Sequence, residues 1–189
     1  LENVDWAKLG YLDVTAGPFY ADPTGVQDST AAIQEAVIFA RTRKLVTFFP
    51  AGTYLVSDTI ECMAGWREHR DPNNPYLPYC EQWPCILMGD PTAESRPKIV
   101  LADQSAGFGA SDPLKAVVYF NSRSWYRQTE DGLQPLDGSN GFLQCIRGLE
   151  IQTGSGNPQA AALFMDAAEG ATIEDCTLNA SDSHAGLWR

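Results

Sequence analysis

A six-residue pattern that occurs twice near the C-terminus places the strongest constraint on the fold. Residues 146–151 and 173–178 both read apolar-x-x-apolar-x-apolar, and the two copies begin 27 residues apart. An interval of this size is typical of one turn of a parallel β-helix, in which each coil stacks on the one before and equivalent side chains pile up inside. The Ala-rich segment 160–165 lies between the copies and supplies another strand of the same coil. The pattern predicts that Ile146 and Ile173 lie on adjacent rungs.

The N-terminal third contains a turn, a capped helix and two strands in succession. Residues 22–25 read Asp-Pro-Thr-Gly, which favours a turn because Pro presets φ and Gly accepts positive φ. Asp28 can then cap a helix over about residues 28–41, since its carboxylate can accept hydrogen bonds from the first amides of the helix. Residues 45–49 and 53–56 are rich in β-branched and aromatic residues and predict strands on either side of a Pro-Ala-Gly break. The apolar face of the helix comprises Ala32, Ile33, Ala36, Val37 and Ala40.

Together these residues resemble the N-terminal signature of the pectate-lyase-like superfamily. In that family a short helix caps the open end of the coil, and a Phe-Pro-Ala-Gly-Thr-Tyr-Leu-Val segment, here residues 49–56, enters the first coils. Residues 97–101 and the turn at 156–158 also resemble coils of the family, whereas residues 21–25 replace the Gly-Asp-Gly turn of many members. The resemblance implies an all-β fold, a single-stranded right-handed parallel β-helix with an N-terminal capping α-helix at about 28–41 and long loop insertions.

The length of the chain bears on its domain organisation, because members of this family usually run on for many more coils. The resemblance therefore implies that residues 1–189 form a single N-terminal β-helix domain of a longer β-helix protein. An uncapped final coil would expose a row of unpaired amides and an apolar column. We therefore expect the remainder of the β-helix or a second chain to cover the C-terminal end.

Two long segments interrupt the regular pattern and are expected to be insertions. Proline is so frequent within 63–84 that central strands are excluded there, and 121–140 is polar without any period. Long excursions from a scaffold often carry function, and aromatic rings on them can stack against the faces of sugars. The alternative is that these rings pack the insertions onto the scaffold. The candidate substrate-binding residues are Trp66, Trp83, Trp125 and Tyr126.

The formal net charge of −11 limits the classes of ligand. It argues against nucleic acid, whose phosphates need a basic surface, and it disfavours polyanionic polysaccharides unless a cation bridges the carboxylates of both. A neutral polysaccharide is easier to reconcile with this charge, although excess acidic residues can also serve solubility alone. No segment is long and apolar enough to span a bilayer, so no membrane partner is expected.

Five cysteines are present, and no CxxC pair or histidine cluster suggests zinc, so no metal site is predicted. Cys80 and Cys85 lie close together in a loop and are the expected disulfide, although Cys62 can pair with either of them. A disulfide implies an oxidising compartment, so we expect a secreted, extracellular protein. Cys176 should stack on Leu149 as a buried free thiol.

The candidate catalytic residues are carboxylates on the C-terminal coils. Glu150 alternates with inward residues and should face outward, while Glu174 and Asp175 are expected in the equivalent strand one coil later. Asp182 and His184 follow in the next turn and can add an acid and a base. Glycosidase chemistry needs two carboxyl groups that flank the scissile bond, and adjacent coils can place such groups side by side. The alternative is that all of these residues are solvent-facing charges.

The resemblance implies a carbohydrate-active protein. We expect a secreted glycoside hydrolase, similar to the β-helical β-1,3-glucanases, that acts on a polysaccharide by carboxylate acid/base chemistry and needs no cofactor. The main catalytic residues would then lie beyond Arg189. Three alternatives remain: a polysaccharide lyase with Ca²⁺ as its cofactor, a phage tailspike-type depolymerase, and a non-catalytic glycan-binding or structural β-helix.

Overall fold

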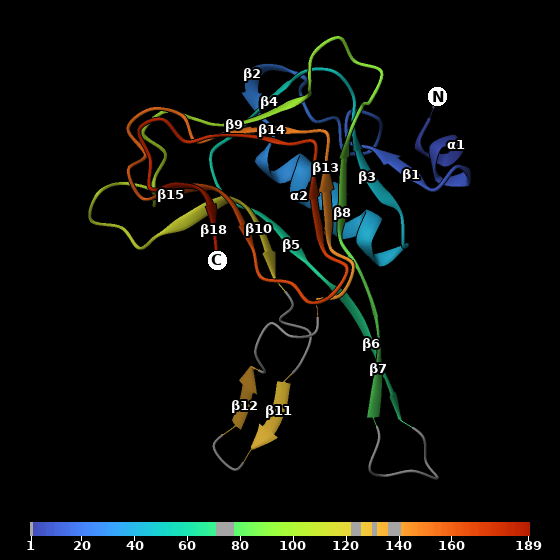
Figure 1. Cartoon of the computed structure of the whole chain (residues 1–189). Helices are drawn as coiled ribbons and strands as arrows, with labels where there is room; N and C mark the ends of the chain where they lie inside the picture. The colour runs from blue at the N-terminus through green and yellow to red at the C-terminus, as the bar shows by residue number, and fades with distance from the viewer. Residues whose placement is uncertain (1, 71–77, 122–125, 130–131, 136–140) are drawn as a thin grey trace.

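The computed structural model describes residues 2–70, 78–121, 126–129, 132–135 and 141–189, and describes no side chains within 65–82 and 122–140. Three parallel sheets, A, B and C, surround a common core (Figure 1). Sheet A contains β1 (Tyr11–Asp13), β3 (Val46–Phe49), β8 (Ile86–Gly89), β13 (Cys145–Arg147) and β16 (Thr172–Glu174). Sheet B contains β2 (Thr24–Asp28), β4 (Thr53–Val56), β9 (Lys98–Leu101), β14 (Glu150–Gln152) and β17 (Thr177–Asn179). Sheet C contains β5 (Ile60–Met63), β10 (Lys115–Asn121), β15 (Ala160–Met165) and β18 (Ala185–Trp188).

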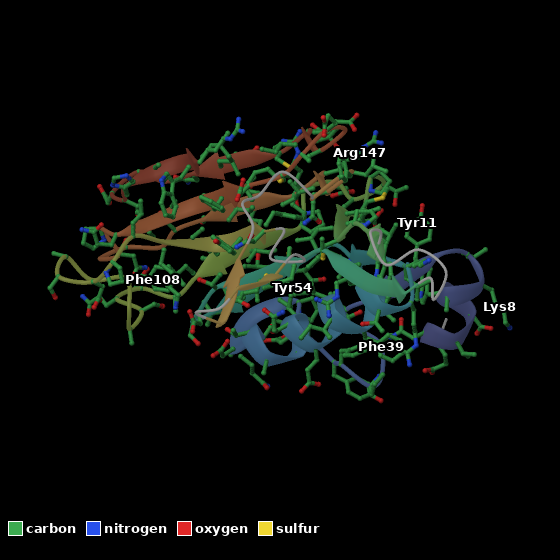
Figure 2. The ribbon with its side chains drawn as sticks, turned by 90° about the horizontal axis from the view of Figure 1, so that it is seen from below. Lys8, Tyr11, Phe39, Tyr54, Phe108 and Arg147 are labelled. Carbon is green, nitrogen blue, oxygen red and sulfur yellow. The ribbon has the colours of Figure 1, made fainter. Side chains whose placement is uncertain are left out.

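The chain visits the three sheets in turn, and each coil after the first adds one rung to each sheet, whereas the first coil adds none to sheet C. Ile146 of β13 pairs with Ile173 of β16, and Ile151 of β14 pairs with Leu178 of β17. The prediction of adjacent rungs is therefore confirmed, and the fold is a parallel β-helix. In Figure 2 the rungs stack from the N-terminal helices at the bottom, in blue, to the C-terminal strands at the top, in red.

Inward side chains form largely apolar columns along these rungs, interrupted in sheet A by the buried Thr47 between Leu12 and Leu87, and their removal from water is the main force that holds the coils together. The column residues that are fully buried are Leu12, Leu87 and Ile146 in sheet A, Tyr54, Ile99 and Ile151 in sheet B, and Ile60, Val118 and Leu163 in sheet C. Tyr54 lies inside the body in Figure 2, whereas Lys8 lies at its outer edge. The last rung is less covered, because Ile173 is 38% and Leu187 52% exposed.

The corner between sheets A and B is tight in the two C-terminal coils. Gly148 has a φ of +67°, and Asp175, which occupies the same corner one coil later, has a φ of +50°. Gly needs no side-chain room in this left-handed conformation, and Asp is one of the residues that tolerates it. The two strands β13 and β14 therefore follow each other almost without a loop.

Two helices lie at the N-terminal end: α1 (Asn3–Lys8) and α2 (Thr30–Thr42). The capping helix expected at about 28–41 is therefore confirmed, and it buries the apolar face that includes Ile33 and Val37. It begins two residues after Asp28, yet the Asp28 carboxylate still accepts a hydrogen bond from the Thr30 amide at 2.9 Å. Among the described residues, neither helix has the length and apolar character needed to cross a membrane.

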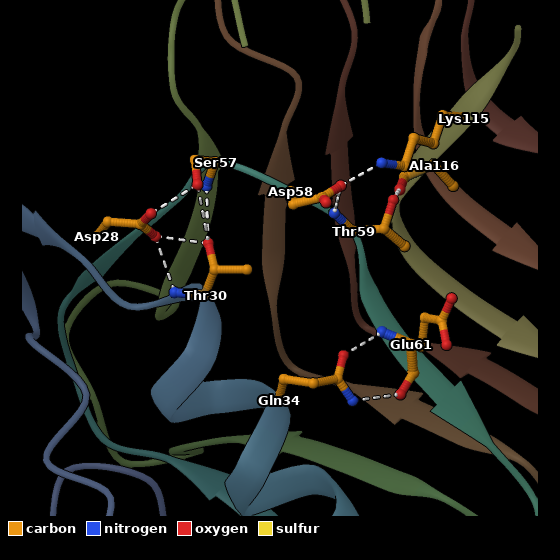
Figure 3. A network of polar contacts seen from close by, with 9 residues as sticks. All are labelled: Asp28, Thr30, Gln34, Ser57, Asp58, Thr59, Glu61, Lys115 and Ala116. Atoms are coloured by element: carbon orange, nitrogen blue, oxygen red, sulfur yellow. Dashed lines mark hydrogen bonds and ion pairs between the residues drawn. The ribbon is translucent and has the colours of Figure 1, made fainter. Parts of the chain in front are cut away.

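The α2 helix covers the lower edge of sheet C, where one of its side chains forms the hydrogen bonds that the backbone of a neighbouring strand would form (Figure 3). The Gln34 amide donates to the Glu61 carbonyl at 3.0 Å and accepts from the Glu61 amide N–H at 2.7 Å. Thr30 acts in the same way, since its hydroxyl accepts from the Ser57 amide at 2.8 Å. These contacts supply partners that a further rung would otherwise give to β5 and the turn before it.

Both insertions contain antiparallel hairpins that project from the bottom of the body in Figure 1. They are β6 (Gly65–Arg70) with β7 (Pro78–Trp83), and β11 (Tyr126–Thr129) with β12 (Gly132–Pro135). As predicted, these described strands of the insertions stand apart from the three parallel sheets. The local hairpin pairing was not predicted, because proline and the lack of a period obscure it.

The expected disulfide between Cys80 and Cys85 is not present. Cys85 is a free thiol buried in the core, and Cys62, its alternative partner, is also a buried free thiol. Cys80 lies within β7, where an extended backbone advances about 3.3 Å per residue, so the strand carries the chain beyond the roughly 4.4–6.8 Å Cα separation of a disulfide. Cys176 is a free thiol as predicted, although it is half-buried and packs against the edge of the core.

Candidate functional site

A polar pocket of about 350 Å³ lies on the outer face of sheet B, where its strands end. Its floor is a column of outward side chains from three successive rungs, Val100 of β9, Gln152 of β14 and Asn179 of β17, which pair in register. Because hydrogen-bonded strands lie about 4.8 Å apart, this column extends over about 10 Å. The pocket is therefore elongated along the axis of the coil.

Two carboxylates stand at the rim of the pocket, on the turns that follow the strands. Asp103 comes just after β9, and Asp182 comes just after β17. Both side chains belong to exposed residues, so a ligand in the pocket can reach them from solvent. Asp182 was predicted as a catalytic residue, whereas Asp103 was missed.

Hydrogen bonds between neighbouring coils fix the wall that carries Asp103. The Asp103 carboxylate accepts from the Ser155 amide N–H at 2.7 Å. The fully buried Asn157 side chain donates to the carbonyls of Ala102 at 2.9 Å and Thr153 at 2.8 Å. Buried amides held in this way are costly to disturb, so the turn after β9 is tied to the turn one coil later.

The turn after β14 depends on a glycine. Gly154 has a φ of +63°, and a Cβ added to it would lie 2.2 Å from the Leu101 carbonyl oxygen. Only glycine combines this conformation with such a close approach of two backbones. The neighbouring polar groups are also linked by hydrogen bonds. The Ser181 hydroxyl donates to the side-chain oxygen of Asn179 at 2.8 Å, and the Ser183 hydroxyl donates to the Thr153 hydroxyl at 2.6 Å.

The donor and acceptor inventory of the pocket suits a ligand rich in hydroxyl groups. Carboxylates accept hydrogen bonds, whereas serine hydroxyls and the amides of Gln152 and Asn179 can both donate and accept. Two carboxyl groups in one cavity are also the minimum that most glycoside hydrolases use, one as acid and the other as base or nucleophile. The pocket therefore presents hydrogen-bonding groups that suit a sugar, together with two carboxylates.

Glu150, another predicted catalytic residue, lies beside this pocket, and its carboxylate already contacts two neighbouring side chains. Its Oε1 accepts from the Gln152 Nε2 at 2.6 Å, and its Oε2 lies 3.2 Å from the Lys98 Nζ. Only 18% of the Glu150 side chain is exposed. Glu150 therefore orients Gln152, which lines the pocket, and its charge is balanced by the lysine on the rung below.

Glu174 and Asp175 do not converge with the other predicted carboxylates. Glu174 pairs with Arg147 in sheet A and forms an ion pair with it at 3.6 Å, whereas Asp175 stands at the corner and forms an ion pair with Arg96. The residue one rung above Glu150 is Thr177. The expectation that Glu174 and Asp175 continue the strand of Glu150 is therefore wrong, because the repeated six-residue pattern spans a corner and belongs to two sheets.

The predicted aromatic binding residues lie on the two insertions. Trp66 belongs to β6 and Tyr126 to β11, but their side chains, like all of Trp125, lie outside the described part of the structure. Trp83 ends β7 and is half-buried, with the Lys44 Nζ 4.9 Å from the centroid of its ring. This cation–π contact holds Trp83 against the scaffold, as the packing alternative proposes.

The three parallel sheets, the helical cap and the pocket built on outward residues of successive rungs define a β-helix protein of the pectate-lyase-like class. Residues 16–188 match the family described as "Rhamnogalacturonase A/epimerase, pectate lyase-like". The chain belongs to that family. No curated protein matches the chain.

A solved structure with a similar fold comes from a virus. ORF18 of Geobacillus virus E2 is 16% identical to this chain and superposes with a TM-score of 0.57. The match covers 97% of this chain and 28% of the viral chain. At this identity the likeness shows the fold alone, and this chain spans little more than a quarter of the viral protein.

Proposed function

We propose that this chain belongs to a glycoside hydrolase that acts on a polysaccharide, and that the pocket on sheet B binds the glycan. The observation that carries the proposal is that one pocket presents two carboxylates, Asp103 and Asp182, next to hydroxyl and amide groups. Membership of a family described as "Rhamnogalacturonase A/epimerase, pectate lyase-like" supports a polysaccharide as the general class of substrate.

In the proposed reaction one of the two carboxyl groups protonates the oxygen of the leaving sugar. The other, ionised, either activates a water molecule or attacks the anomeric carbon. Gln152 and Asn179 hold hydroxyl groups of the glycan along the floor. Glu150 takes no direct part, because its contacts with Lys98 and Gln152 make it a positioning residue.

The proposal is tested with the variants Asp103→Asn and Asp182→Asn, assayed on a panel of neutral and uronic polysaccharides. Each substitution keeps the shape of the side chain but removes the acid, so we expect a loss of reducing-end release of about 100-fold or more. The matched control is Glu94→Gln, on the exposed link between β8 and β9, which should keep full activity.

Three results would contradict the hydrolase proposal. The first is that the unaltered protein releases no reducing ends from any polysaccharide. The second is that it forms unsaturated products in a reaction that a Ca²⁺ chelator abolishes, which identifies a lyase. The third is that both asparagine variants keep full activity, which places the reaction away from this pocket.

A further inference from the structure

A second hollow, of about 480 Å³, lies on the outer face of sheet A beside α1. Its floor is made by Phe48 of β3 and Met88 of β8, which pair in register with each other and with Asp13 of β1. Trp6 of α1 and Tyr11 of β1 stand beside this floor. The groove therefore crosses three rungs, or about 10 Å along the axis of the coil.

The aromatic rings form a strip, not a box. Trp6 stacks on Phe48 with ring centroids 5.7 Å apart and an angle of 29°, and Tyr11 meets Phe48 edge-on at 5.9 Å and 77°. A site for a compact cation brings several ring faces round one point. A strip of apolar and aromatic surface instead fits the flat C–H face of a sugar ring.

Two carboxylates of the groove are fixed by the same local motif, Asp-x-Thr. The Asp13 Oδ1 accepts from the Thr15 amide at 2.8 Å and its hydroxyl at 2.7 Å. The Asp90 Oδ1 accepts from the Thr92 amide at 2.8 Å and its hydroxyl at 2.7 Å. In both residues these bonds fall on one oxygen, so Oδ2 retains acceptor capacity, and the more exposed Asp90 is the one that can offer it to the hydroxyl of a ligand, since Asp13 is only 8% exposed.

The wall that carries Trp6 is also fastened to the sheet. The Asn3 side chain accepts from the Asp13 amide at 2.9 Å and donates to the carbonyls of Asp13 at 3.1 Å and Gly17 at 2.8 Å. A short helix has little stability of its own, so this bracket sets where the indole ring lies. The groove is thus formed before any ligand arrives.

We propose that this groove is an accessory binding site for neutral sugar units of a glycan, separate from the pocket on sheet B. The proposal rests on the proposed function and deepens it, because it names a neutral glycan as the substrate class. Among the described residues, those that line the groove include Asp13 and Asp90 but no Lys or Arg. Their charge repels uronate carboxylates, whereas the Asp90 carboxylate can accept bonds from sugar hydroxyls while the sugar faces cover Trp6 and Phe48.

The test measures binding of laminarihexaose, cellohexaose and an oligogalacturonate by isothermal titration calorimetry. We expect one of the neutral oligosaccharides to bind and the oligogalacturonate not to bind. Trp6→Ala should weaken the neutral sugar about 10-fold or more, and Asp90→Asn should weaken it measurably while keeping the turn, since Asn forms the same turn. The matched control is Trp188→Ala, which removes a tryptophan from sheet C and should leave the affinity unchanged.

Several outcomes would overturn the groove proposal. They are unchanged affinity in folded Trp6→Ala and Asp90→Asn proteins, tighter binding of the oligogalacturonate, and no binding of either neutral sugar. Circular dichroism shows whether the variants are folded, and Asp90→Asn decides the matter if Trp6→Ala is not. Binding without hydrolysis would support the groove proposal and refute the hydrolase proposal. Hydrolysis with unaffected binding in both variants would refute the groove proposal and support the hydrolase proposal.

Discussion

Replacing Gln34 with alanine tests whether a helix side chain completes the lower edge of sheet C. The change removes two hydrogen bonds to the Glu61 backbone, at 2.7 and 3.0 Å. A typical hydrogen bond contributes about 0.5–1.5 kcal/mol net, and water can reach this exposed edge once the amide is gone. Alanine also gains a few tenths of a kcal/mol of helix propensity. We expect a net loss of about 1–2 kcal/mol, or roughly 2–8 °C in Tm for a chain of this size.

The assay is thermal and urea unfolding, together with amide hydrogen exchange at Glu61. Loss of its acceptor should make the Glu61 amide exchange faster, while amides in β14 keep their rates. The matched control is Gln27→Ala on β2, where the hydrogen bond to Asp22 comes from the backbone and survives the substitution. An unchanged Tm together with unchanged exchange at Glu61 would refute the view that the Gln34 side chain replaces the hydrogen bonds of a neighbouring strand.

Two further predictions concern stability. Phe164 stacks on Tyr119 at 4.6 Å and meets Trp188 edge-on at 4.8 Å on the outside of sheet C, so Phe164→Ala should cost about 2–3 kcal/mol in urea unfolding; a loss below about 0.5 kcal/mol would show that these ring contacts add nothing. Hydrogen bonds, above all from the Gln27 amide, lower the pKa of Asp22 from 3.8 to about 2. The stabilisation from Asp22 is therefore present above about pH 4 and is lost as the pH falls toward 2, so Asp22→Asn should flatten the dependence of unfolding free energy on pH in that window, and an equally steep curve would contradict the assignment.

The strands of the coil could be predicted from sequence because each carries its own signal. Residues 53–56 and 160–165 have the same bounds in the sequence interpretation and in the structure. Their β-branched and apolar side chains face a core that is continuous along the axis, so local propensity and tertiary packing agree. The helix at Thr30–Thr42 was predicted for the same reason, since its apolar face has one place to go.

The candidate sites were harder to predict, because they depend on residues that come together only across coils. Asp103 and Asp182 line one pocket although a hairpin insertion separates them in sequence, and no local period marks either residue. Trp6 and Tyr11 precede the predicted helix whereas Phe48 lies in the strand predicted after it, and only the register of sheet A and the position of α1 bring them to one outer face. Sequence alone predicts the strands that form the rungs. It does not show which outward side chains stack in a column next to a turn.

The placement of Glu174 shows a different limit. The six-residue pattern was taken as one strand, but Gly148 turns the chain by adopting a left-handed conformation in its middle. Glu174 therefore stacks on Arg147 in sheet A, while the rung above Glu150 in sheet B is Thr177. Glycine readily adopts positive φ, so the glycine at this position was the sequence signal that could have divided the pattern into two strands.

The contacts of α2 recur at the repeat length of the coil. Gln34 meets Glu61, and Thr30 meets Ser57, each 27 residues further on, the same step that separates Ile146 from Ile173. The helix thus takes the place of a strand of sheet C in the first coil, and these two contacts join it to the coil directly above. Whole coils can consequently be gained or lost above the helix during evolution without disturbing its contacts. The number of coils in this architecture can therefore vary only on the side away from α2.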